Sequence, residues 1–190
     1  MNAAPNVAPV HRIEVRVREL NQLFNSMDPS PFYEKELDAD AEEFIVGWAR
    51  ELPADEPFGL VVYLDRMPGH DDAAGIVTEA VQHFFAYKTD FTRRRLAQLT
   101  RTGWKDLGTG LLFLAACIFT AHLVGTIGEG PALTILTESL VIGGWVAMWR
   151  PMEVFLYERW PLKRLVRLYE RMSRMPVEVR LRPVDAEPVA

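Results

Sequence analysis

Two long apolar stretches dominate the hydropathy pattern in the second half of the chain. Residues 108–127 contain no Asp, Glu, Lys or Arg, and residues 131–149 contain a single charged residue, Glu138. A helix of 20 residues is about 30 Å long, which is the thickness of the hydrocarbon layer of a bilayer. Only three residues separate the stretches. The pattern therefore predicts a transmembrane helical hairpin over residues 106–150. The alternative is a pair of core helices in a soluble protein, but such helices normally carry a polar side.

Three shorter stretches predict β-strands. Residues 11–20 (HRIEVRVREL) and 177–182 (VEVRLR) alternate apolar with charged positions, as strands with one polar face do. Residues 58–65 (FGLVVYLD) are apolar at their centre, which is typical of a strand buried on both faces. We expect the C-terminal strand to return after the hairpin and join the N-terminal sheet.

Helices are predicted between and after these strands. Asp40 is the predicted N-cap of the first, with Glu43 at capping-box spacing, and its apolar stripe comprises Ala41, Phe44, Ile45, Trp48 and Ala49. A long helix should start near Asp71 or Asp72 and run almost into the first apolar stretch, with an apolar face formed by Ile76, Ala80, Val81, Phe84, Phe85 and Phe91. Residues 151–176 should form an amphipathic helix along the membrane surface, bent at Pro151 and Pro161.

The predicted fold class is an α+β membrane protein. Residues 11–105 form a small cytoplasmic α+β module of about three strands, whose last strand is contributed by residues 177–182. The hairpin follows the long helix of this module, and the ends of the chain, 1–10 and 183–190, are predicted to be loose tails.

The charge distribution predicts the orientation of the hairpin. Residues 1–92 carry 7 Lys/Arg and 17 Asp/Glu, whereas residues 93–182 carry 14 and 7. The turn between the apolar stretches has no basic residue, so both termini should be cytoplasmic. The basic residues predicted to contact anionic headgroups are Arg93, Arg94, Arg95, Arg101, Lys105, Arg150, Lys163 and Arg164.

Small and ionisable residues within the spans are the candidate functional positions. Small residues recur every four positions and predict a helix-packing seam, either within the hairpin or between protomers: Cys117, Ala121, Gly125, Ser139, Gly143 and Ala147. His122 and Glu138 should lie at similar depth in antiparallel helices. A polar pair in a membrane can couple ions or protons, or simply form a structural hydrogen bond, and we favour the structural interpretation.

No known catalytic or metal-binding motif is present. His70, Asp71 and Asp72 could attract a metal, but helix capping explains acidic residues at this position better. The acidic residues at 34–40 lack the glycine and oxygen spacing of a calcium loop. The basic residues near the membrane favour lipid over nucleic acid. We therefore predict no catalytic residue, no cofactor, no metal and no nucleic-acid partner.

The chain resembles an uncharacterised group of bacterial two-span membrane proteins. The resemblance covers most of residues 11–182 and rests on NSMDPSPFYEKELDADAEEFIVGWARE, HFFAYKTDFTRRRLAQLTRTG, and WRPMEVFLYERWPLKRLVRLYERMSRM before VEVR. It implies the hairpin architecture and a location in the bacterial inner membrane, and it implies no activity.

The function predicted from these observations is a non-enzymatic, membrane-anchored interaction or oligomerisation module. Its expected partners are anionic lipid and either another protein or a second copy of the chain. A small oligomeric transporter or channel using His122 and Glu138 is the alternative. An enzyme acting on lipid is the weakest hypothesis.

Overall fold

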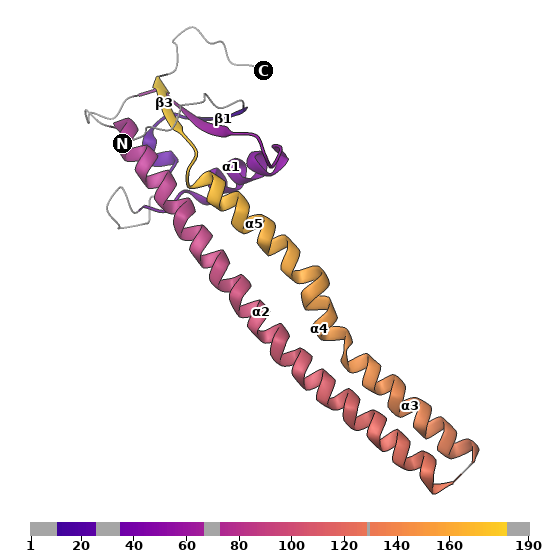
Figure 1. Ribbon diagram of the computed structural model, residues 1–190. Helices are drawn as coiled ribbons and strands as arrows, with labels where there is room; N and C mark the ends of the chain where they lie inside the picture. The colour runs from indigo at the N-terminus through magenta and orange to yellow at the C-terminus, as the bar shows by residue number, and fades with distance from the viewer. Residues whose placement is uncertain (1–10, 26–34, 67–72, 129, 182–190) are drawn as a thin grey trace. The chain divides into compact units, whose positions relative to one another are not determined.

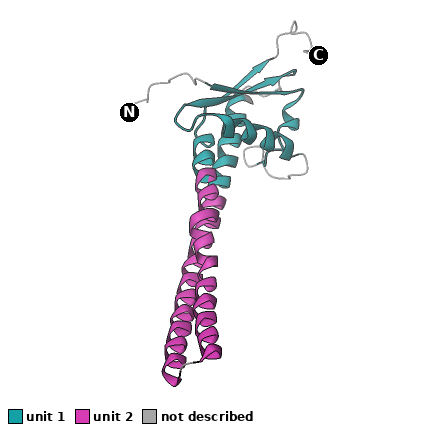
Figure 2. Ribbon diagram, turned by 90° about the vertical axis from the view of Figure 1, so that its right-hand side faces the viewer, with its two compact units in different colours: residues 1–90, 166–190 teal, residues 91–165 magenta. Residues whose placement is uncertain are grey.

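The structure is a computed structural model that describes residues 11–25, 35–66, 73–128 and 130–181. The chain divides into two compact units (Figure 2). Unit 1 comprises residues 1–90 and 166–190, and unit 2 comprises residues 91–165. The long helix α2 (Ala73–Ile127) contributes to both units, as does the helix α5 (Arg159–Met172).

A three-stranded parallel sheet is the centre of unit 1. Its strands are β1 (His11–Val17), β2 (Phe58–Leu64) and β3 (Val177–Leu181), in the order β1-β2-β3 (Figure 1). The register places Val62 of β2 between Val15 of β1 and Val179 of β3. The prediction that the C-terminal strand joins the N-terminal sheet is therefore confirmed.

The two faces of the sheet differ in polarity. On β1, Ile13 and Val15 are buried, whereas the alternate residues Arg12, Glu14 and Arg16 are exposed. On β2, six of seven residues are buried, including Val61, which lies on the same face as Glu14. The helices of unit 1 lie on one side of the sheet (Figure 2). The apolar face of β1 is therefore the face that packs into the core.

The helix α1 (Ala39–Glu51) starts earlier than predicted. Its N-cap is Asp38, whose Oδ1 accepts a hydrogen bond from the Asp40 amide at 3.1 Å. The prediction of Asp40 as the cap was wrong, because Asp40 is already within the first helical turn and its amide is the donor that needs a partner. A short 3-10 turn, η1 (Leu20–Gln22), precedes α1 in the chain.

The buried stripe of α1 is also rotated from its predicted position. Ile45, Val46 and Ala49 are buried, while Phe44 and Trp48 are 45% and 51% exposed. The two aromatic rings contact each other instead, with centroids 6.2 Å apart. The smaller side chains thus occupy the face that packs towards β1.

The first part of α2 packs in unit 1. The helix is 55 residues long and continues without a break into the first apolar stretch, as predicted. Its fully or nearly buried residues are Val77, Ala80, Val81, Phe84 and Phe85. Ile76 is only half-buried and Phe91 is exposed, although both were predicted to belong to the apolar face. Val77, which was not part of that prediction, is fully buried. The proposed capping residues His70, Asp71 and Asp72 lie outside the described residues.

The end of α5 completes the core of unit 1. Val166, Tyr169 and Met172 are buried, and the ring of Tyr169 stacks on Phe85 of α2 with centroids 6.1 Å apart. The C-terminal part of the predicted interfacial helix, residues 151–176, therefore packs its apolar residues into unit 1. Its apolar face is covered by protein, because the chain must re-enter unit 1 to form β3.

Hydrogen bonds from α2 hold the connection between α5 and β3. Gln82 Nε2 donates to the Met175 carbonyl at 3.0 Å, and Thr78 Oγ1 approaches the Val177 carbonyl at 3.3 Å. An ion pair of 2.9 Å between Lys88 and Glu42 links α2 to α1 in the same unit. These contacts join segments that are far apart in the sequence.

Burial raises the pKa of Tyr169 above its ordinary value of 10.0, and the negative charge of Glu42 adds to this effect. A raised pKa in the folded state means that folding favours the neutral phenol. This contribution to stability is complete below about pH 10 and is lost as the pH rises towards the pKa of the folded state.

We therefore expect Tyr169→Phe to reduce the alkaline loss of stability. Between pH 9 and pH 11, the denaturant midpoint of the detergent-solubilised protein, followed by circular dichroism, should fall more steeply for the wild type than for the variant. Tyr157→Phe is the matched control, because Tyr157 is 71% exposed. Equal slopes for the wild type and Tyr169→Phe would contradict the assignment.

Candidate functional site

Unit 2 is an antiparallel helical hairpin. Residues 91–127 of α2 pack against α3 (Pro131–Ala147), α4 (Trp149–Glu153) and the π-helical turn η3 (Val154–Glu158) (Figure 1). Buried and half-buried residues of α2 alternate at spacings of four and three: Gly103, Leu107, Gly110, Leu114, Cys117, Ala121 and Val124. The opposing segment shows the same spacing at Leu133, Thr137, Leu140, Gly144, Ala147, Pro151 and Val154. This heptad pattern is that of a coiled coil, and we call these residues the hairpin seam.

Glycines mark the closest approaches along the hairpin seam. A Cβ atom on Gly144 would lie 2.8 Å from Leu114 Cδ1 and 3.2 Å from Cys117 Cβ. A Cβ atom on Gly103 would lie 2.8 Å from Val154 Cγ1. At Gly110, the same atom would be 3.2 Å from the Ala147 carbonyl oxygen. The backbones can therefore approach closely only because these side chains are absent.

The predicted set of small residues matches the hairpin seam only in part. Cys117 and Ala121 are buried and Ala147 is half-buried. Gly125, Ser139 and Gly143 are exposed, and a Cβ on Gly125 or Gly143 would meet no atom within 4 Å. A four-residue spacing rotates by about 40° per step on a helix with 3.6 residues per turn, so the pattern leaves the contact face. Alternating spacings of three and four residues stay on the contact face.

The two prolines after the second apolar stretch change the helix without ending it. Pro161 has no N–H to donate to the carbonyl four residues earlier, and a π-helical turn lies directly before it, in which the Arg159 amide donates to the Val154 carbonyl. Pro151 likewise offers no N–H to the Ala147 carbonyl, which is the oxygen that faces Gly110. A π-turn thus accompanies Pro161, and a close contact with α2 accompanies Pro151.

The two ionisable residues of the apolar stretches do not contact each other. His122 and Glu138 are both exposed, and within the described part of the chain no hydrogen bond or ion pair joins them. They lie outside the hairpin seam. The polar pair remains a sequence-based prediction.

The basic residues near the apolar stretches occupy different environments. Arg93, Arg94, Arg95, Arg101, Lys105 and Arg164 are exposed. Lys163 is half-buried, with Nζ 6.0 Å from the centroid of the Trp160 ring. Arg150 Nη1 contacts Glu153 at 3.1 Å and Glu158 at 2.9 Å, so its charge is compensated within the protein.

The apolar surface of unit 2 is exposed. Two helical segments are long and apolar enough to cross a membrane, with windows of mean hydropathy 2.0 and 1.4. Only 17% and 6% of these windows are buried. Core helices of a soluble protein would be mostly covered, so within this single chain the segments do not resemble such helices.

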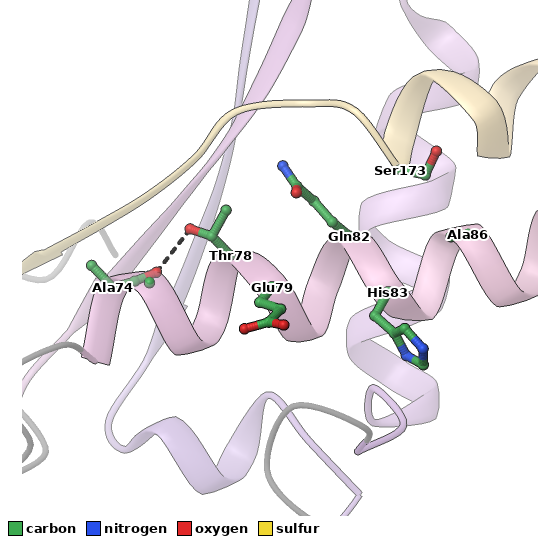
Figure 3. Close-up of a pocket in the computed structure, with 8 residues that line it drawn as sticks. Ala74, Thr78, Glu79, Gln82, His83, Ala86 and Ser173 are labelled. Atoms are coloured by element: carbon green, nitrogen blue, oxygen red, sulfur yellow. Dashed lines mark hydrogen bonds between the residues drawn. The ribbon is translucent and has the colours of Figure 1, made fainter.

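A shallow, open pocket in unit 1 was not predicted. It is lined by Ala74, Gly75, Thr78, Glu79, Gln82, His83, Ala86 and Ser173 (Figure 3). Glu79 and His83 project to a different side of α2 from Thr78 and Gln82, whose polar atoms already bond to the backbone. Among the described residues, no group of three His, Cys, Asp or Glu is placed to hold a metal ion.

Comparisons with protein-family models, curated proteins and solved structures give no match to this chain.

We expect Gly144→Cys to form a disulfide with Cys117 in the same chain. The two Cβ atoms would lie 3.2 Å apart, slightly below the usual 3.5–4.5 Å, so a small shift of the helices suffices. Treatment of membranes with a permeant oxidant should yield an intramolecular cross-link, detected by mass spectrometry of the non-reduced protein. Gly143→Cys, one residue away and facing open space, is the control and should not cross-link. A cross-link in Gly143→Cys and none in Gly144→Cys would show that the register of the hairpin seam is different.

Proposed function

We propose that the protein is a membrane-anchored interaction module of the bacterial inner membrane. Its hairpin crosses the bilayer and its α+β unit faces the cytoplasm. The observation that carries the proposal is the exposed apolar surface of the hairpin, which stays uncovered on both candidate spans. Lipid is the environment that removes the cost of exposing such a surface to water.

The charges around the hairpin support the proposed orientation. The exposed basic residues Arg93, Arg94, Arg95 and Arg101 precede the first apolar stretch, and Arg164 follows the second. The described residues of the turn, Gly128 and Gly130, carry no charge. Basic residues are retained on the cytoplasmic side of membrane proteins and attract anionic headgroups there.

The α+β unit supplies the interaction part of the proposal. It is built from both sides of the hairpin, because β1, β2 and α1 precede the hairpin and β3 follows it. An anchor connected at two points keeps such a unit at the membrane surface. The proposal assigns no catalytic step to either unit.

Membrane insertion is tested by extraction. We expect alkaline carbonate to leave the protein in the membrane pellet and a mild detergent to release it. A protein that leaves the membrane in carbonate and stays monodisperse without detergent would contradict the proposal.

The orientation is tested with single cysteines in a Cys117→Ala background. Gly128→Cys in the turn should react with a membrane-impermeant maleimide in intact spheroplasts. Asp55→Cys, at an exposed position in unit 1, should react only after the membrane is opened. Labelling of Asp55→Cys in intact spheroplasts would reverse the proposed sidedness.

A further inference from the structure

One face of the parallel sheet in unit 1 is left without a helix by the described residues. Parallel sheets are normally covered on both faces, but the helices of this unit lie on one side (Figure 2). The other face presents Arg12, Glu14 and Arg16 from β1 and Glu178 and Arg180 from β3. The side chains of Glu14, Arg16, Glu178 and Arg180 are between 41% and 64% exposed. The sheet therefore offers a charged, exposed surface.

The strand register arranges these charges in two rows of opposite sign. Glu14 and Glu178 lie on either side of Val61, and form an acidic row across the sheet. Two residues further along, Arg16 and Arg180 lie on either side of Tyr63 and form a basic row. Alternate residues of a strand are about 6.6 Å apart. We call this surface the two-row face.

Within one chain the two rows are already partly compensated. Arg16 Nη2 lies 4.0 Å from Glu14 Oε2, and Arg180 Nη2 lies 2.5 Å from Glu178 Oε2. The hydrogen bond to Glu178 raises the pKa of Arg180, with a smaller contribution from Tyr63. The two rows carry equal numbers of each sign, and Arg12 adds one positive charge among the described residues of this face. The face therefore has no strong excess of either sign that would favour a uniformly charged partner such as nucleic acid.

We propose that the two-row face binds the same face of a second copy of this chain. A twofold axis in the plane of the interface and perpendicular to the strands places the acidic row of each copy over the basic row of the other. Glu14 then faces Arg16 of the second copy, Glu178 faces Arg180, and Tyr63 lies against Val61. A twofold axis parallel to the strands would place like charges together. The pattern is therefore self-complementary in one orientation, as an isologous interface requires.

This inference rests on the proposed interaction function and specifies its partner. Val61 is already buried within one chain, so a symmetric pairing would mainly cover the half-buried Tyr63, and it would satisfy the preference of parallel sheets for two covered faces.

The test uses three charge variants of the full chain, each carrying one of two affinity tags. Glu14→Arg/Glu178→Arg makes the face basic, Arg16→Glu/Arg180→Glu makes it acidic, and the combination of all four substitutions exchanges the rows. Co-purification of differently tagged copies from detergent-solubilised membranes measures self-association, and circular dichroism checks that each variant is folded.

We expect wild-type chains to co-purify. The basic and the acidic variants should each lose self-association by at least tenfold, whereas a mixture of the two should regain it. The row-exchanged variant should pair with itself and not with the wild type. Misfolded variants could not regain self-association when the basic and the acidic variant are mixed. Recovery on mixing therefore shows that the arrangement of charges determines the pairing.

Two outcomes would overturn the inference. Self-association that persists in both the basic and the acidic variant would place the contact elsewhere, for example in the hairpin. Wild-type chains that never co-purify would exclude a dimer. Neither outcome affects the proposed membrane anchoring, because carbonate extraction and cysteine labelling test it independently.

Discussion

The return of the chain after the hairpin is the constraint on which the rest of the structure depends. β3 reaches the sheet only after the chain has passed through α2, α3 and α5, yet it pairs directly with the central strand β2. Tyr169 and Met172 must be brought back at the same time to bury the apolar side of α2. Unit 1 therefore cannot complete its core until the helices of unit 2 have been made. This couples the folding of the α+β unit to the formation of the hairpin.

The elements that could be predicted are those whose pattern has a clear period. Alternation identified β1 and β3, and uninterrupted apolar composition identified β2 and the two long helices. The predictions that were wrong concern which residues of an element are buried, and this depends on the tertiary neighbours of each side chain. Phe44 and Trp48 fit an amphipathic stripe on α1, but the buried residues are the smaller Ile45, Val46 and Ala49. Sequence periodicity cannot distinguish these faces, because both are compatible with one helical stripe.

The hairpin seam illustrates the same limit for the candidate site. Cys117 and Ala121 could be found from their small size, but the four-residue pattern that included Gly125 and Gly143 does not follow the contact face. A heptad of small residues at Gly103, Gly110 and Cys117 was present in the sequence and would have located it. The pocket around Gln82 and the two-row face depend on strand register and tertiary contacts. Neither leaves a local signal in the sequence.

The π-turn at residues 154–158 has a consequence for insertions and deletions in this chain. A π-turn accommodates one residue more than the α-helix it interrupts, and each residue turns an α-helix by about 100°. Loss of a single residue there would restore regular α-helix and leave Tyr169 on the side that faces Phe85, whereas loss of a residue from the regular helix that follows would turn Tyr169 by about 100°. Between Pro151 and Tyr169, a one-residue deletion should therefore be tolerated within residues 154–158 and should be disruptive in the regular helix after them.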